Sequence, residues 1–176
     1  MSERSIHLSP YSEQWPKEFD KEKEALLKVI RDWTVDIQHI GSTAIVGLSA
    51  KPIIDIAIGV RNLEEVDQYC ISRIQSLGYD YVQQYEVELP NRRYFRKASL
   101  KGKRTHQIHL VEIESDEWKR YILFRDYLRS HPEVAKEYEQ LKKRLAKIYL
   151  DANEYAAKKT SFIRKIEAQA REESRS

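Results

Sequence analysis

The spacing of apolar side chains divides the chain into stretches with a helical period and stretches with the period of a strand. Residues 13–33 place apolar side chains three and four apart, as on one face of a helix, and Pro16 stands near the start, where proline is tolerated. Residues 35–42 alternate apolar and polar side chains, and residues 51–60 form a short apolar run, so both predict strands. The pattern over residues 63–78 predicts a helix that its terminal glycine ends.

The second half of the chain begins with strand patterns and continues as helix. Three further strands are expected over residues 79–89, 92–100 and 105–113. After Ser115 the alternation disappears, and the sequence predicts three helices. Pro132 separates the first from the second, and Asp151 is a residue type favoured at the start of the third.

This order of elements predicts the fold class and its division. Four or five strands, with helices before, between and after them, indicate an α+β protein with a mixed α/β sheet. We expect residues 1–114 to form the α/β core and residues 115–176 to form a helical region packed on it, within one compact domain. The length of 176 residues is sufficient for a sizeable core.

Composition excludes several protein classes. Hydrophobic residues make up 41% of the chain, a share typical of a globular protein rather than a disordered one. No run approaches the ~18 apolar residues of a membrane span, and residues 1–15 lack the apolar segment of a signal peptide. Cys70 is the only cysteine, which excludes a disulfide framework and a thiolate metal cluster. We therefore expect a cytoplasmic protein without a membrane partner.

Charge adds one local feature to this picture. The net charge of +3 is too small to favour nucleic acid as a partner. Residues 92–106 nevertheless carry seven Lys and Arg side chains and no acidic one. The ordinary interpretation is a solvated hairpin with a basic loop, and the functional interpretation is an electropositive wall for phosphates.

A single acidic residue in an apolar strand is the most informative position. Alternation places Ile54, Ile56, Ile58 and Val60 on one face of the strand, and Ile53, Asp55, Ala57 and Gly59 on the other. An unpaired carboxylate in mid-strand costs several kcal/mol, so Asp55 requires a partner. A structural salt bridge is one solution. The preceding Gly41-Ser42 turn favours another, in which backbone N–H groups and a cation held by Asp55 bind phosphate.

This arrangement resembles a known superfamily. A Gly-Ser turn, a spacer and an acid-bearing strand are similar to the nucleotidyltransferases of the DNA polymerase β type. The strings HIGSTAIVGLSAKPIIDI, RRYFRK, RTHQIHL and FRDYLR, with the closing pattern of Tyr155, Lys159, Phe162 and Ile163, closely resemble the GrpB family, also called UPF0157. The likeness extends from residue 10 to about residue 170. It implies a nucleotidyltransferase-like fold, a short mixed β-sheet flanked by helices with a C-terminal helical region, in a family also found fused to dephospho-CoA kinase.

The chain departs from the superfamily at one position. Active members carry two carboxylates one residue apart, which hold two Mg²⁺ ions, whereas this strand has Ala57 at the second position. Histidines could compensate, since imidazole favours Zn²⁺ or Mn²⁺ over Mg²⁺. The candidate metal ligands are therefore Asp55, His109, His106, His39 and Glu112. His106 and His109 face opposite ways on a regular strand, and a hydrogen-bonded structural role is the alternative for each histidine.

Six residues are candidates for binding phosphate. These are Gly41, Ser42, Lys51, Arg93, Arg96 and Arg104. Four residues on the last two helices could stack on or contact a base, namely Tyr138, Lys142, Tyr155 and Lys159, although packing between helices is the ordinary interpretation for the tyrosines. The sequence leaves these helices three roles: a lid, a wall for the base or the interface of a homodimer.

Two functions remain open. The first is a metal-dependent transfer of NMP from an NTP to an unknown acceptor, with Asp55 on the metal and His109 completing the metal site or acting as base. The second is a non-catalytic module that binds a nucleotide or another phosphorylated small molecule. Ala57 favours the second function, and the Gly-Ser turn with Asp55 favours the first. The implied cofactor is Mg²⁺ or Mn²⁺, or Zn²⁺ through the histidines.

Overall fold

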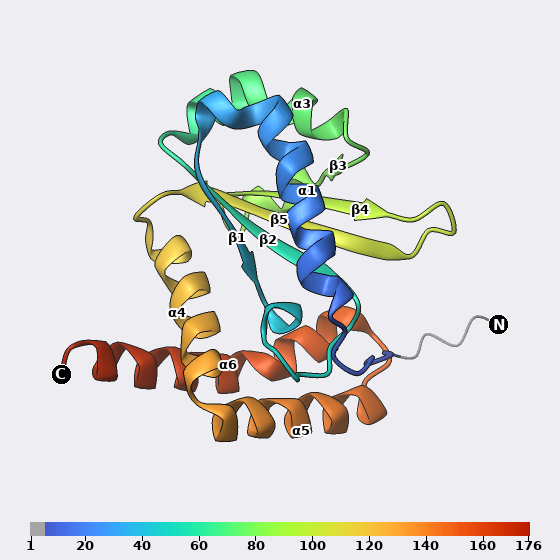
Figure 1. The fold of residues 1–176 in the computed structure, drawn as a ribbon, viewed down its shortest axis with the longest axis vertical. Coiled ribbons are helices and arrows are strands. Elements are labelled where there is room, and N and C mark those ends of the chain that lie inside the picture. The colour runs from blue at the N-terminus through green and yellow to red at the C-terminus, as the bar shows by residue number, and fades with distance from the viewer. Residues whose placement is uncertain (1–5) are drawn as a thin grey trace.

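A computed structural model describes residues 6–176 and shows a five-stranded sheet in the order β1-β2-β5-β4-β3 (Figure 1). The strands are β1 (Thr34–Ile40), β2 (Ile54–Val60), β3 (Asp80–Tyr81), β4 (Arg92–Ala98) and β5 (Arg104–Glu112). Strands β2 and β5 are parallel, and every other neighbouring pair is antiparallel. The mixed sheet of an α+β protein is therefore confirmed.

Helices follow the order that the apolar spacing predicts. They are α1 (Gln14–Ile30), α2 (Leu63–Glu65), α3 (Ile71–Gln75), α4 (Asp116–Ser130), α5 (Pro132–Ile148) and α6 (Ala152–Ser174). A π-helical turn, Val66–Cys70, joins α2 to α3, and short 3₁₀ turns follow α1 and β1. No helix among residues 6–176 combines the length and the apolar character needed to cross a membrane.

The strand predicted over residues 79–89 is wrong for most of its length. Only Asp80–Tyr81 pairs with β4, and a 3₁₀ turn, Gln83–Glu86, follows. The Tyr81 hydroxyl donates to the Glu86 carboxylate, which closes this turn. The turn also packs Tyr85 against Tyr94 of β4, with ring centroids 5.4 Å apart. Since β3 is the last strand of the sheet, these contacts within the turn replace the pairing that a longer strand would need.

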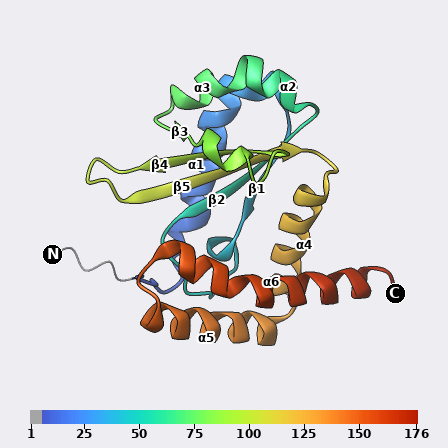
Figure 2. The ribbon, with the colours of Figure 1, turned by 180° about the vertical axis from the view of Figure 1, so that it is seen from behind.

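Different layers cover the two faces of the sheet. The face of β2 with Ile54, Ile56, Ile58 and Val60 is fully buried in a core that α1 and the α2–α3 segment complete, as the alternation predicts. On the opposite face, Ala57 packs with Trp118 of α4. A further apolar cluster joins α4, α5 and α6 to Ile45 and Leu48, so the C-terminal helices pack on the loop between β1 and β2 (Figure 2).

The start of α6 depends on one side chain. Asp151 Oδ1 accepts hydrogen bonds from the backbone N–H groups of Asn153 and Glu154, at 2.9 and 3.0 Å, which confirms the predicted N-cap. We expect Asp151→Ala to lower the free energy of unfolding by about 1 kcal/mol because two helical N–H groups lose their acceptor. Asp151→Asn keeps an acceptor and serves as the control. Urea denaturation measures both, and equal losses in the two variants would contradict the capping role.

Candidate functional site

The face of the sheet away from α1 carries the polar residues of the candidate site. In the register of the strands, Asp55 of β2 is opposite Gln107 of β5, and His109 of β5 is opposite Tyr94 of β4. Paired residues point to the same side of a sheet. Asp55, Gln107, His109 and Tyr94 therefore share one face, as strand alternation predicts for Asp55 and for His109 with Gln107.

Gly41 and Asp55 form one structural unit. Ile40, the last residue of β1, pairs with Asp55, so the following Gly41 lies directly beside the carboxylate. A Cβ atom on residue 41 would be 2.6 Å from Asp55 Oδ2. The backbone of Gly41, with φ 73° and ψ −172°, also lies in a region that is essentially restricted to glycine. Both the turn and the carboxylate thus require glycine at this position.

The side chain of His109 is held between a donor and an acceptor. Its Nδ1 is 3.2 Å from Arg92 Nη1, and its Nε2 is 3.4 Å from Asp55 Oδ1. Arginine can only donate, so Nδ1 accepts and Nε2 carries the proton that is donated to Asp55. Neither nitrogen is then free to bind a metal or to accept a proton. In this geometry His109 positions Asp55 rather than acting as the predicted base or ligand.

Gln107 adds a second hydrogen bond to the same carboxylate. With its amide nitrogen toward Asp55, Gln107 donates to Oδ1 at 3.0 Å and accepts from Arg104 Nη1, also at 3.0 Å. Asp55 is therefore held by Gly41, His109 and Gln107. No Lys or Arg nitrogen among residues 6–176 lies within ion-pair distance of it.

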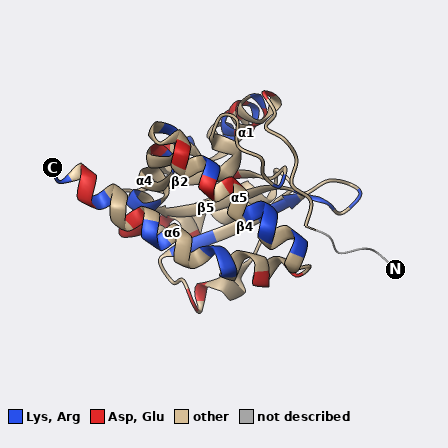
Figure 3. Cartoon of the chain, turned by 90° about the horizontal axis from the view of Figure 1, so that it is seen from below, with Lys and Arg blue, Asp and Glu red and all other residues tan. Residues whose placement is uncertain are grey.

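A pocket of about 330 Å³ opens above this face, between the sheet and helices α5 and α6. The positive side chains of its wall are Lys51, Arg92, Arg104, Lys142 and Lys159. Asp55 is the one carboxylate in the wall among the residues described. Lys and Arg recur on the C-terminal helices and near the β4–β5 hairpin in Figure 3, which views the molecule from this end. The pocket therefore has an excess of positive charge.

The lysines of the pocket are buried close to one another, which disfavours their charged form. Burial, and then the charge of Lys159, lowers the pKa of Lys142 to about 7. Burial, and then the charge of Lys51, lowers the pKa of Lys159 to about 8. Burial lowers the pKa of Lys51 as well, although Asp55 opposes this shift. An anion bound among them would favour the charged form of all three.

Two polar atoms of the pocket residues have no hydrogen-bond partner among residues 6–176. They are the Tyr155 hydroxyl, on a side chain that is 1% exposed, and Arg92 Nε. A buried polar group without a partner costs free energy, so the packing around these two residues leaves two hydrogen-bond donors unsatisfied. Arg92 was not a predicted site residue. Its position two residues before Tyr94 in β4 identifies it, but only once the register of β4 is known.

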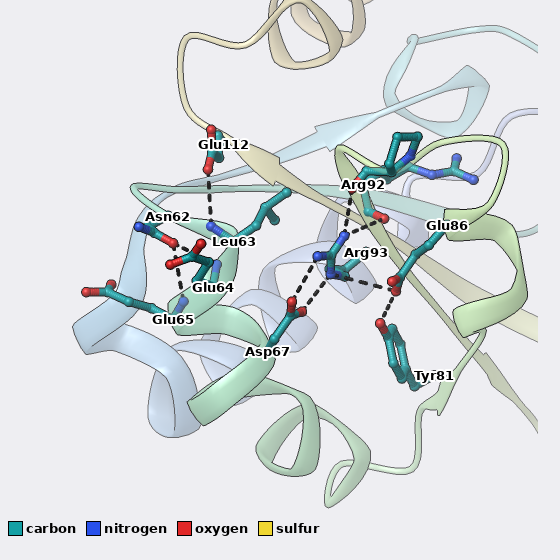
Figure 4. Close-up of polar contacts among 11 residues, drawn as sticks. Asn62, Leu63, Glu64, Glu65, Asp67, Tyr81, Glu86, Arg92, Arg93 and Glu112 are labelled. Carbon is teal, nitrogen blue, oxygen red and sulfur yellow. Dashed lines mark hydrogen bonds and ion pairs between the residues drawn. The ribbon is translucent and has the colours of Figure 1, made fainter.

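Arg93 and Glu112 do not line the pocket, and Figure 4 shows the contacts that they make instead. Arg93 points to the opposite face of β4, where Nε and Nη2 donate to the two carboxylate oxygens of Asp67 at 2.6 and 2.9 Å. Glu112, at the far end of β5, accepts from the backbone N–H of Leu63 at 3.2 Å. Their predicted phosphate-binding and metal-binding roles do not fit these positions.

His39 and His106 are on the α1 side of the sheet. The His39 ring stacks on Phe19, and its Nε2 is 2.9 Å from Thr43 Oγ1. Burial lowers the pKa of His39 to about 4, which keeps it neutral. His106 lies beside Glu22, whose carboxylate also accepts from Lys97 at 2.9 Å.

The predicted set of five metal ligands is therefore not assembled. Only Asp55 and His109 meet, and no group of three His, Cys, Asp or Glu side chains suited to a metal occurs among residues 6–176. Gly41, Ser42, Lys51 and Arg104 lie at the pocket or beside Asp55, as predicted for phosphate-binding residues. Arg96 lies in an adjoining cavity instead.

The contact between Gly41 and Asp55 can be tested by a double-mutant cycle. We expect Gly41→Ala to destabilise the protein by about 2 kcal/mol or more, because it combines backbone strain with a clash against the carboxylate. Gly47→Ala is the control, since Gly47 also has a positive φ but a Cβ there meets no atom within 4 Å.

Adding Asp55→Ala should recover part of the Gly41→Ala loss and none of the Gly47→Ala loss. The test measures the free energy of unfolding in urea for the three single variants and for the two double variants that combine Asp55→Ala with each glycine substitution. Strict additivity of Gly41→Ala and Asp55→Ala would contradict the contact.

Comparisons with known proteins assign the chain to a family. It matches the family described as GrpB protein over residues 5–169. It is 42% identical to the glutamate-rich protein GrpB of Alkalihalophilus pseudofirmus, over 92% of this chain and 93% of that protein. It is 41% identical to the UPF0157 protein YqkA of Bacillus subtilis, over 96% of this chain but 48% of that protein, so here it spans about half of its relative.

A solved structure has the same fold. The crystal structure of the conserved protein GrpB from Enterococcus faecalis superposes with a TM-score of 0.86 at 35% identity, covering 97% of this chain and 100% of that chain. The resemblance suggested by the Gly-Ser turn and the Asp55 strand is thus confirmed at the level of the family. The chain belongs to the GrpB (UPF0157) family.

Proposed function

We propose that the pocket binds a nucleotide, or another phosphorylated small molecule, with its phosphates among the basic side chains. One observation carries this proposal: five Lys and Arg side chains surround a cavity whose described wall contains a single carboxylate. Such a cluster is costly when it is empty of anions, and phosphate oxygens supply the missing negative charge.

The aromatic residues of the pocket support a nucleoside in particular. Tyr85 and Tyr94 line the cavity and pack against each other beside Arg92. Aromatic rings offer a base a flat surface for stacking, which contributes about 1–3 kcal/mol. A nucleotide whose phosphates lie near Lys142 and Lys159 and whose base lies near the tyrosines would contact both the basic and the aromatic side chains of the pocket.

Asp55 is suited to hold one divalent ion that arrives with the phosphates. Mg²⁺ is commonly bound through one or two carboxylates together with substrate phosphates and water. The donors fit one such ion, Mg²⁺ or Mn²⁺, which would neutralise phosphate charge. They do not fit a two-metal centre, because the second position of the strand is the buried Ala57. They do not fit a zinc site either, because both nitrogens of His109 are engaged.

Transfer of NMP to an acceptor hydroxyl is the second candidate function. The observation in its favour is the rigid placement of Asp55 by Gly41, His109 and Gln107, which exceeds what binding of phosphates alone requires. The missing second carboxylate makes binding the better-supported function. Release of pyrophosphate from ATP would distinguish the two.

Calorimetric titration tests the proposed binding. ATP, GTP, CTP and UTP are titrated, each with Mg²⁺ and with Mn²⁺, into the wild-type protein and into Lys159→Met. We expect at least one nucleotide to bind, and Lys159→Met to weaken it by about 10-fold or more, because a charge-assisted hydrogen bond contributes about 1.5–3 kcal/mol. Lys158→Met, which removes an exposed neighbour on the same helix, should leave the affinity within about 2-fold.

Asp55→Ala completes this experiment. If Asp55 holds a divalent ion, the wild-type protein should bind the nucleotide more tightly with the metal than in a further titration with EDTA, and the variant should lose this difference in affinity. A folded wild-type protein that binds none of the four nucleotides would overturn the nucleotide proposal.

Binding should also depend on pH. A bound anion favours the charged form of the lysines. At pH values near or above the pKa of Lys142 (about 7) or of Lys159 (about 8), part of that lysine is neutral in the free protein, so binding should be accompanied by proton uptake. The affinity should therefore fall as the pH rises above about 7. Titrations in two buffers with different ionisation enthalpies measure the proton uptake. If Lys159→Met takes up as many protons on binding as the wild type does, Lys159 is not one of the groups that become protonated.

A further inference from the structure

A second cavity adjoins the pocket. It has a volume of about 720 Å³ and lies between the β4–β5 hairpin, the segment at His7 and the start of α6. We call it the outer cavity. Lys51, Ile53, Arg104 and Ala152 line both spaces, so these four residues lie at the boundary between the two cavities. A volume of this size is typical of sites for small molecules.

The outer cavity has basic side chains of its own. Arg96 and Lys103 line it, together with the shared Lys51 and Arg104. Neither Arg96 nor Lys103 forms an ion pair with a carboxylate among residues 6–176. Lys97 also lines the cavity, but its ammonium group is paired with the buried Glu22 at 2.9 Å.

The remaining wall is partly acidic and partly apolar. Of the two acidic residues, Asp151 is engaged as the N-cap of α6, and Asp80 lies at the edge of the sheet. Pro52, Ile53 and Leu150 supply apolar surface. The outer cavity thus combines unpaired cations with an apolar wall, which suits a group with an apolar or aromatic body and an anionic end.

We infer that the outer cavity is a second subsite for a phosphorylated group, so that the site takes two phosphorylated groups side by side. The inference rests on the proposed function, because the first group occupies the pocket of Asp55. The second group comes either from the far end of one bridged molecule or from a separate molecule. In both cases Arg96 and Lys103 bind its phosphate, while Lys51 and Arg104 lie between the two groups.

The test compares probes that fill one subsite or two. ATP and diadenosine tetraphosphate are titrated with Mg²⁺ into the wild-type protein and into the double variant Arg96→Gln/Lys103→Gln. Lys101→Gln, on the same hairpin but outside both cavities, is the control. A bridged ligand predicts a loss of about 10-fold or more for diadenosine tetraphosphate in the double variant, with ATP within about 2-fold. Lys101→Gln should change neither.

A second titration identifies a separate molecule. AMP is titrated into protein that is already saturated with ATP. Binding of AMP to the wild type that disappears in the double variant supports a separate phosphorylated compound, whereas an effect confined to diadenosine tetraphosphate supports one bridged ligand. Circular dichroism checks that the double variant keeps its fold, and a misfolded variant is replaced by the single Lys103→Gln, whose side chain is exposed.

The outcomes separate this inference from the proposed function. If ATP binds and depends on Lys159, but neither diadenosine tetraphosphate nor AMP depends on Arg96 and Lys103, the second subsite is overturned and the pocket remains. If Arg96→Gln/Lys103→Gln weakens ATP as strongly as diadenosine tetraphosphate, the outer cavity belongs to the first ligand and the inference is again overturned. If no probe binds to the wild type, the proposed function fails and the second subsite fails with it.

Discussion

The site depends on the absence of a single methyl group. Asp55 Oδ2 lies only 2.6 Å from the position that the Cβ atom of any other residue at position 41 would take. Because residue 41 is glycine, the end of β1 can lie directly against the Asp55 carboxylate of β2, and the chain then continues into the turn at Ser42–Ala44. His109 and Gln107 then hold the other oxygen of the same carboxylate. The position of Asp55 is thus determined by the backbone of one strand and the side chains of another.

Around this fixed negative charge the protein accumulates positive charge from five parts of the chain. Lys51 precedes β2, Arg92 and Arg104 come from β4 and β5, and the remaining lysines come from α5 and α6. Burying such groups without counter-charges opposes folding, and the lowered pKa values of the lysines express that cost. A cost of this kind is typical of sites that are completed by a ligand. Phosphate supplies both the charge and the acceptors that these side chains lack.

Much of the fold, and part of the site, could be predicted from the sequence. Period-two alternation placed Asp55 opposite the core face of its strand and separated His109 from His106, because both depend only on counting along one strand. The choice of Arg93 failed for a related reason. Residues 92 and 93 point to opposite faces, and only the pairing of β4 with β5 decides which arginine joins Asp55. The strand predicted over residues 79–89 was too long, because alternation does not show that an edge strand has no further neighbour. Lys142 and Lys159 were recognised only as possible base contacts, since nothing local places two distant helices over the sheet.

The hydrogen bond from Lys142 to the carbonyl of Ser49 joins residues 93 positions apart in the chain. Strands β1 to β5 are all made before residue 113, whereas the lysines that close the pocket follow much later. The pocket is therefore incomplete until α5 and α6 have been made, and the crowding of positive charge around Asp55 begins only when these helices reach the sheet. The order of the sequence thus supplies the two helical lysines of the pocket after every strand that forms its floor.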